Sequence, residues 1–79
     1  MTTITQLEKS LERTRKQVLK GKCLKGDFGI IECQKSIKEE IEYSGKSLHQ
    51  LYVEYITRAL KDSMFNTTMI VACELLMKG

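Results

Sequence analysis

Residues 30–61 read IIECQKSIKEEIEYSGKSLHQLYVEYITRALK, and the spacing of their apolar side chains decides the fold class. The residues that recur every three or four positions, as one helix face requires, are Ile30, Cys33, Ile37, Ile41, Ser44, Leu48, Leu51 and Tyr55. Gly45 leaves two interpretations open. It could end one helix, with Ser47 and Gln50 capping the next. Alternatively, one helix runs from about residue 28 to 62, since an interior glycine costs only about 1 kcal/mol. The continuous helix is favoured, because the apolar spacing crosses Gly45 without a shift.

A second helix is predicted over residues 3–20. Its apolar face consists of Ile4, Leu7, Leu11, Thr14 and Val18, spaced as in helices that pack on other helices. Thr5 with Glu8 could form its capping box, or Thr2 or Thr3 could cap it one turn earlier. Three glycines in residues 21–29 predict a turn, and Asp27 is the expected cap of the helix that follows.

The C-terminal segment is apolar nearly all round. Its apolar residues are Met64, Phe65, Met69, Ile70, Val71, Ala72, Cys73, Leu75, Leu76 and Met77, and Asn66 could cap a short helix here. Such a helix requires burial on every side. In a chain of 79 residues this predicts another subunit or a partner protein as the cover.

Together these segments predict one all-α domain, residues 1–79, built as an antiparallel helical hairpin with a short apolar C-terminal helix. The sequence has no apolar run long enough to span a membrane. Cys23, Cys33 and Cys73 cannot all pair within one chain and are too scattered for a zinc site, so free thiols in the cytoplasm are expected. His49 is the only histidine, and no catalytic, metal or cofactor site is predicted. A non-enzymatic role is expected.

Positive charge is concentrated near the N-terminus. Seven basic and two acidic side chains give residues 1–25 a charge of +5, and six against eight give residues 26–79 a charge of −2, for a total of +3. The candidate anion-binding residues, on the helix face opposite the apolar one, are Lys9, Arg13, Lys16 and Lys20. A small nucleic-acid-binding regulator is therefore an alternative function. Interleaved acidic residues and the lack of aromatic ones make a solvated face the favoured interpretation.

The apolar face of residues 48–60 is wider than one helical contact needs, which is typical of a binding surface. The predicted partner-binding residues are Leu7, Leu11, Leu48, Leu51, Tyr52, Tyr55, Ile56 and Leu60. The spacing of Leu48, Leu51 or Tyr52, and Tyr55 suits helix-in-groove binding. An oligomeric helical inhibitor of a host protein is a further alternative, and the chain could form a homo-oligomer when alone.

Two patches resemble a known family. The opening Met1-Thr2-Thr3-Ile4-Thr5-Gln6-Leu7-Glu8, with Leu11 and Arg15, is similar to the start of the small helical-hairpin co-chaperones of type III secretion systems. Leu51-Tyr52-Val53-Glu54-Tyr55, followed by Ala59-Leu60, is similar to the tyrosine-bearing second helix of that family.

The resemblance implies a cytosolic, non-enzymatic chaperone. Members pair with a larger helical-repeat chaperone, and together the two keep the needle subunit soluble and monomeric before export. The family's partner-binding surface would correspond here to Leu7, Leu11, Tyr52, Tyr55 and Leu60.

Overall fold

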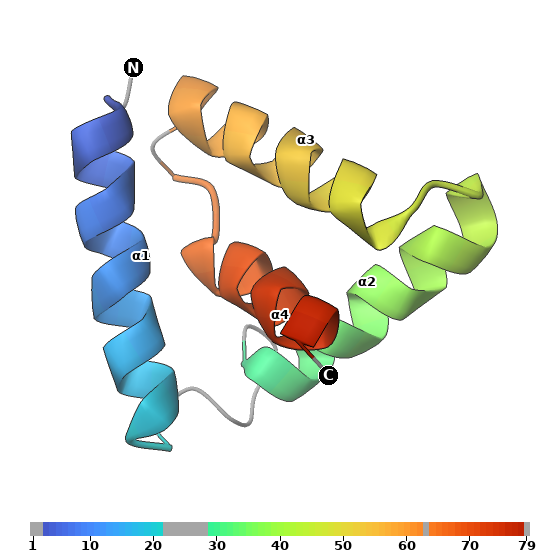
Figure 1. Ribbon diagram of the computed structural model, residues 1–79, viewed down its shortest axis with the longest axis horizontal. Helices are drawn as coiled ribbons and strands as arrows, with labels where there is room; N and C mark the ends of the chain where they lie inside the picture. Colours follow the sequence, from blue (N-terminus) through green and yellow to red (C-terminus); the bar gives the residue numbers. More distant parts are fainter. Residues whose placement is uncertain (1–2, 22–28, 63, 79) are drawn as a thin grey trace.

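The computed structural model describes residues 3–21, 29–62 and 64–78, which contain four α-helices and no strand. The helices are α1 (Ile4–Leu19), α2 (Ile30–Ser44), α3 (Leu48–Lys61) and α4 (Thr67–Lys78). The predicted all-helical class is confirmed, and the arrangement in Figure 1 is consistent with a helical hairpin to which α4 is added.

Helix α1 has the predicted extent, and its cap is Thr3, one of the alternatives that the sequence left open. The Thr3 hydroxyl accepts a hydrogen bond from the Gln6 N–H at 3.2 Å, and the Thr3 N–H donates to Gln6 Oε1 at 3.1 Å. This reciprocal pair is a capping box two residues before the alternative Thr5–Glu8 box. The helix ends where predicted, since Gly21 follows it with a φ of +76°.

The predicted continuous helix over residues 28–62 is wrong. Helix α2 ends at Ser44, and Gly45 adopts a φ of +71°, a left-handed conformation that glycine enters without steric cost. Three residues later α3 begins, and its Ser47 cap accepts a hydrogen bond from the Gln50 N–H at 3.1 Å. The second helix arm is therefore two helices, as in the alternative interpretation.

Replacement of Gly45 with alanine tests this break directly. A Cβ at Gly45 would meet nothing within 4 Å, so left-handed backbone strain is the main effect. We expect a loss of about 1–2 kcal/mol in the free energy of unfolding, measured by urea denaturation followed by circular dichroism. If the helix were continuous, the same substitution would instead raise the free energy of unfolding by about 0.5–1 kcal/mol, because alanine is favoured over glycine inside a helix.

The start of α2 also differs from expectation. The helix begins at Ile30 with Gly29 at its N-cap, rather than near residue 28. The cap predicted at Asp27 lies outside the described residues.

Helix α4 is the centre of the fold. It packs against α2, α3 and α1, and in Figure 1 it lies between them. Asn66 caps it as predicted, because its side-chain Oδ1 accepts a hydrogen bond from the Thr68 N–H at 3.0 Å. The α4 residues in the common core are Ile70, Val71, Ala72 and Cys73.

The chain itself covers most of this apolar helix. The other buried apolar residues around it are Leu7, Leu11, Ile30, Cys33, Ile37, Leu51 and Ala59, which come from all three remaining helices. The expectation that α4 requires another protein as its cover is therefore corrected. Among the apolar residues of α4, only Leu75 and Met77 are exposed.

A buried polar contact joins α1 to the first turn of α4. Thr14, the polar member of the α1 stripe, donates a hydrogen bond from Oγ1 to the Ser10 carbonyl at 3.0 Å. The Thr67 hydroxyl oxygen lies 2.8 Å from Thr14 Oγ1, and when Thr14 donates to Ser10 it is Thr67 that donates to Thr14. Both hydroxyls are satisfied, so the stripe can carry threonine at a buried position.

Candidate helix-docking groove

An open groove of about 670 Å³ lies between α1 and α3. Its apolar walls are formed by Ile4, Leu7, Leu11, Tyr52, Ile56 and Leu60. Three polar side chains of α1 also line it, namely Glu8, Glu12 and Arg15. We call this set of residues the α1–α3 groove. It exists because α4 holds α1 and α3 apart along much of their length, so that these two helices contact each other only sparsely.

Burial differs across the apolar walls. Leu7 and Leu11 belong to the buried core and form the base of the groove on the α1 side. The three α3 residues are half-buried, and Ile4 is 65% exposed at one end of α1. The groove therefore offers apolar surface that the chain only partly covers.

A polar cluster, formed by Arg15, Tyr52 and Glu74, joins three helices beside the groove. Arg15 Nε donates to Glu74 Oε1 at 2.8 Å, and Arg15 Nη2 pairs with the other carboxylate oxygen. The Tyr52 hydroxyl donates to Glu74 Oε2 at 2.9 Å. The bidentate ion pair and the tyrosine contact tie α1, α3 and α4 together at this point.

This arrangement favours the ionised form of Glu74. The hydrogen bonds from Arg15 hold the pKa of the Glu74 carboxyl below its usual value, and the Tyr52 hydroxyl acts in the same direction, whereas partial burial opposes both. Burial, together with the bond to Glu74, raises the pKa of Tyr52. At neutral pH the cluster therefore holds a carboxylate, a guanidinium and an un-ionised phenol.

The structure brings together five of the eight predicted partner-binding residues. Leu7, Leu11, Tyr52, Ile56 and Leu60 all line the α1–α3 groove. The remaining three, Leu48, Leu51 and Tyr55, lie outside the groove.

Leu51 is buried in the core, and Leu48 packs against that core. Tyr55 packs on Phe65, with ring centroids 5.8 Å apart. These three side chains cover α4 and the core, so the structure does not present them in the groove.

The sequence prediction missed Ile4, Glu8, Glu12, Arg15 and Glu74 as members of this region. The sequence predicts Ile4 as part of the apolar face that packs on another helix. In the structure Ile4 lies in the first turn of α1 and is largely exposed. Glu74 carried a usable signal, because it is the only charged residue between positions 64 and 77. A lone carboxylate in an apolar helix requires a partner, although the sequence does not say which one.

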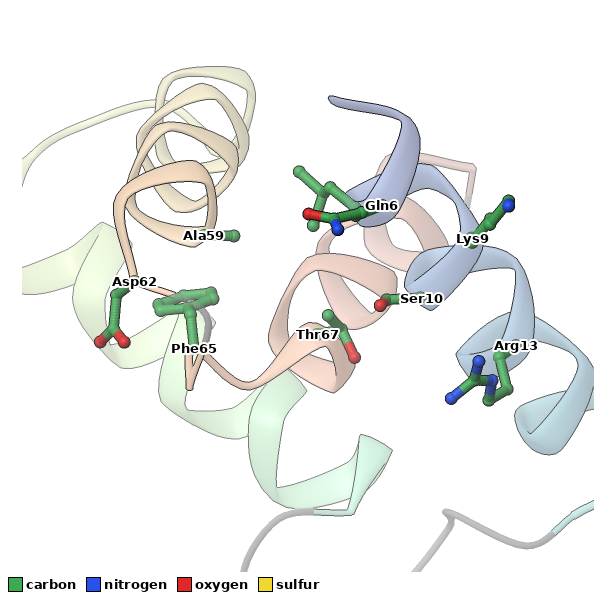
Figure 2. Close-up of a pocket in the computed structure, with 9 residues that line it drawn as sticks. Gln6, Lys9, Ser10, Arg13, Ala59, Asp62, Phe65 and Thr67 are labelled. Atoms are coloured by element: carbon green, nitrogen blue, oxygen red, sulfur yellow. The ribbon is translucent and has the colours of Figure 1, made fainter. Parts of the chain in front are cut away.

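The candidate anion-binding residues lie on another face of α1. Lys9, Arg13, Lys16 and Lys20 are all exposed, and Lys16 pairs with Glu12 at 3.6 Å. Figure 2 shows the smaller hollow of about 370 Å³ next to this stripe, with Arg13 on one side and the Asp62 carboxylate on the other. In that view Lys9 extends away from Asp62. The hollow therefore has mixed charge, which does not favour an anion.

The described residues also bear on metal binding, membrane crossing and thiol reactivity. Across residues 3–21, 29–62 and 64–78, no three His, Cys, Asp or Glu side chains gather to hold a metal ion, and no helix is long and apolar enough to span a membrane. Burial raises the pKa of the Cys73 thiol to about 11 and also raises that of Cys33, so neither readily forms a nucleophilic thiolate. Cys23 lies outside the described residues.

Comparison with protein-family models, with curated proteins and with solved structures gives no significant match to this chain.

Proposed function

We propose that this protein is a non-enzymatic binding module that holds an amphipathic helix of a second protein in the α1–α3 groove. The observation that carries this proposal is the convergence of six apolar side chains from two helices on one open groove. Partner helices are recognised in this way, by apolar anchors that enter a groove between helices.

The polar groups around the groove favour a protein partner over a small molecule. A small-molecule site needs convergent polar groups that orient its ligand. Here Arg15 and Tyr52 are both engaged by Glu74. Glu8 and Glu12 add negative charge beside the apolar walls. The preferred partner is therefore an amphipathic helix with Lys or Arg flanking its apolar stripe.

The more specific form of the proposal is a cytoplasmic co-chaperone of a type III secretion system. Its partners would be a larger helical-repeat chaperone and the needle subunit, which the complex would keep soluble and monomeric before export. Support comes from the residues that carry the family resemblance, since Ile4, Leu7, Leu11, Tyr52 and Leu60 are also residues of the groove. Helix α4 is a departure from the two-helix hairpin that the resemblance implies.

The test is a binding measurement with two matched isoleucine variants. Ile4→Lys places an ammonium group beside the groove, and Ile31→Lys places one on α2, outside the groove. The two side chains are 65% and 54% exposed, so neither change disturbs the core. The chain would be co-expressed with the helical-repeat chaperone and the needle subunit of the same genome, and affinities measured by calorimetry on the purified proteins.

We expect Ile4→Lys to weaken binding about tenfold or more, because the change removes an apolar anchor and places a charged group where the apolar stripe of the partner helix would dock. Ile31→Lys should bind as the parent does. Equal binding by Ile4→Lys and the parent would exclude this groove as the docking site. Failure of the parent chain to bind either protein would exclude the co-chaperone role.

A nucleic-acid-binding role is the second candidate, favoured by the exposure of all four basic residues on α1. The pairing of Lys16 with Glu12 and the presence of Asp62 near Arg13 weaken it. Titration of the same purified chain with DNA and RNA at low salt distinguishes the two functions, since phosphate binding falls steeply as salt is added.

A further inference from the structure

The face of α1 that borders the groove extends beyond it. A second hollow, of about 160 Å³, is lined by Arg15, Val18 and Leu19 of α1 and by Val71, Glu74 and Leu75 of α4. Arg15 lines both hollows. At about 100° per residue, the α1 residues of the two hollows are centred on the same side of the helix. One surface therefore runs along α1 from Ile4 to Leu19.

Four exposed residues of this surface form a palindromic pattern. In chain order they are Ile4, Glu8, Arg15 and Leu19, which fall within about 60° of one another around the helix. Glu12, at the edge of the same surface, is also exposed and lies outside the pattern. The midpoint between Ile4 and Leu19 is also the midpoint between Glu8 and Arg15. Ile4 is 65% exposed and Leu19 is 87% exposed, so both ends of the surface are apolar and uncovered.

We propose that, in the absence of another protein, this surface binds a second copy of the chain, with the two α1 helices antiparallel about a two-fold axis between Leu11 and Glu12. Ile4 then packs against the partner's Leu19, and Glu8 faces the partner's Arg15. The two-fold axis repeats both contacts, as a self-complementary dimer interface requires.

Charge decides the antiparallel direction. A parallel pair would place Glu8 opposite Glu8 and Arg15 opposite Arg15, whereas the antiparallel pair makes two opposite-charge contacts and aligns the helix dipoles favourably. Arg15 can make this contact without releasing Glu74, because Glu74 occupies Nε and Nη2, and the donors on Nη1 remain. The two Glu12 side chains come close to the axis, and Lys16 at 3.6 Å offsets their repulsion.

The dimer has a consequence for the proposed function. The second α1 would cover Ile4 and the mouth of the groove, so the dimer and a complex with a partner helix would exclude each other. This consequence rests on the proposed function, whereas the dimer itself does not. Its test therefore uses the purified protein alone.

Disulfide cross-linking in a Cys23→Ser background tests the interface and its direction. Cys33 and Cys73 are buried and do not compete. Ile4→Cys and Leu19→Cys chains are mixed and oxidised mildly at low concentration. We expect a cross-linked dimer from the mixture and little from either variant alone, because the antiparallel contact joins position 4 to position 19. Lys9→Cys mixed with Lys20→Cys, at positions about 120° around α1 from the centre of this surface, is the control and should remain uncoupled.

Analytical ultracentrifugation of chains without introduced cysteines supplies an independent measurement. The parent chain should dimerise, and Glu8→Arg should shift the dimer–monomer equilibrium towards monomer about tenfold or more by opposing the partner's Arg15. A parent that is monomeric at about 100 µM, Ile4→Cys chains that couple mainly to themselves, or control chains that couple as fast as the mixture would each overturn the proposal. Both experiments use the purified chain alone, so their results are independent of the binding test of the proposed function.

Discussion

Substitution of Ile70 by alanine is expected to remove about 2–5 kcal/mol from the free energy of unfolding, which is the cost of truncating a fully buried aliphatic side chain. Ile70 is 0% exposed on α4, the helix that packs against all three others. The core cluster that contains Ile70 draws residues from all four helices, which cannot all close on the cavity without disturbing one another. A chain of 79 residues has little stability to spare, so the variant should be close to unfolding at room temperature.

Urea denaturation of the parent and the variant, followed by circular dichroism, measures this effect. The matched control is Leu75→Ala, on the same helix at a partly exposed position, where we expect a change of about 0.5 kcal/mol or less. A loss below about 1 kcal/mol for Ile70→Ala would contradict the central position of α4. Equal losses in the two variants would do the same.

The all-helical class could be predicted from the sequence because helix periodicity is a local property. The stripe from Ile4 to Val18 predicted α1 almost to the residue. Local chemistry also identified Asn66 as a cap and Gly21 as a helix end. Each of these predictions depends on residues within a few positions of one another, which is the range over which periodicity and capping operate.

The break at Gly45 could not be decided in the same way. Helices α2 and α3 both pack on α4, so each needs an apolar face. The three residues between them happen to preserve the apolar spacing, which therefore carries no information about the break. The deciding property is the positive φ of Gly45, and a periodic pattern does not report it.

The sequence predicted that α4 is buried but not which surfaces bury it. That prediction needs the contacts between helices distant in sequence. The Arg15–Glu74 pair joins residues 59 positions apart, and the Thr14–Thr67 contact joins residues 53 apart. The same limit explains why Leu51 was predicted in the binding surface and lies in the core.

A large protection of the Cys73 thiol is the second principal expectation. Cys73 is 0% exposed on α4, and burial raises its pKa to about 11. A reagent can reach it only when α4 separates from the other helices. If the chain alone has a stability of about 5 kcal/mol, at the low end for folded domains, labelling should be slower than in the unfolded chain by on the order of 10³-fold.

Cys33 provides an internal reference for this expectation. It is buried on α2, which packs directly on α4. Because both thiols lie in one core cluster, they should become accessible together, in the same cooperative opening. Similar protection of the two thiols would show that α4 does not open independently of α2.

The rate of Cys73 labelling in the purified Cys23→Ser protein, without any partner, tests most directly the central claim that this chain buries its own apolar helix α4. We predict strong protection of Cys73 and Cys33 at closely similar rates, abolished by urea. Rapid labelling of Cys73 in native buffer, suppressed only when a partner protein is added, would contradict it, because α4 would then depend on that partner for its cover.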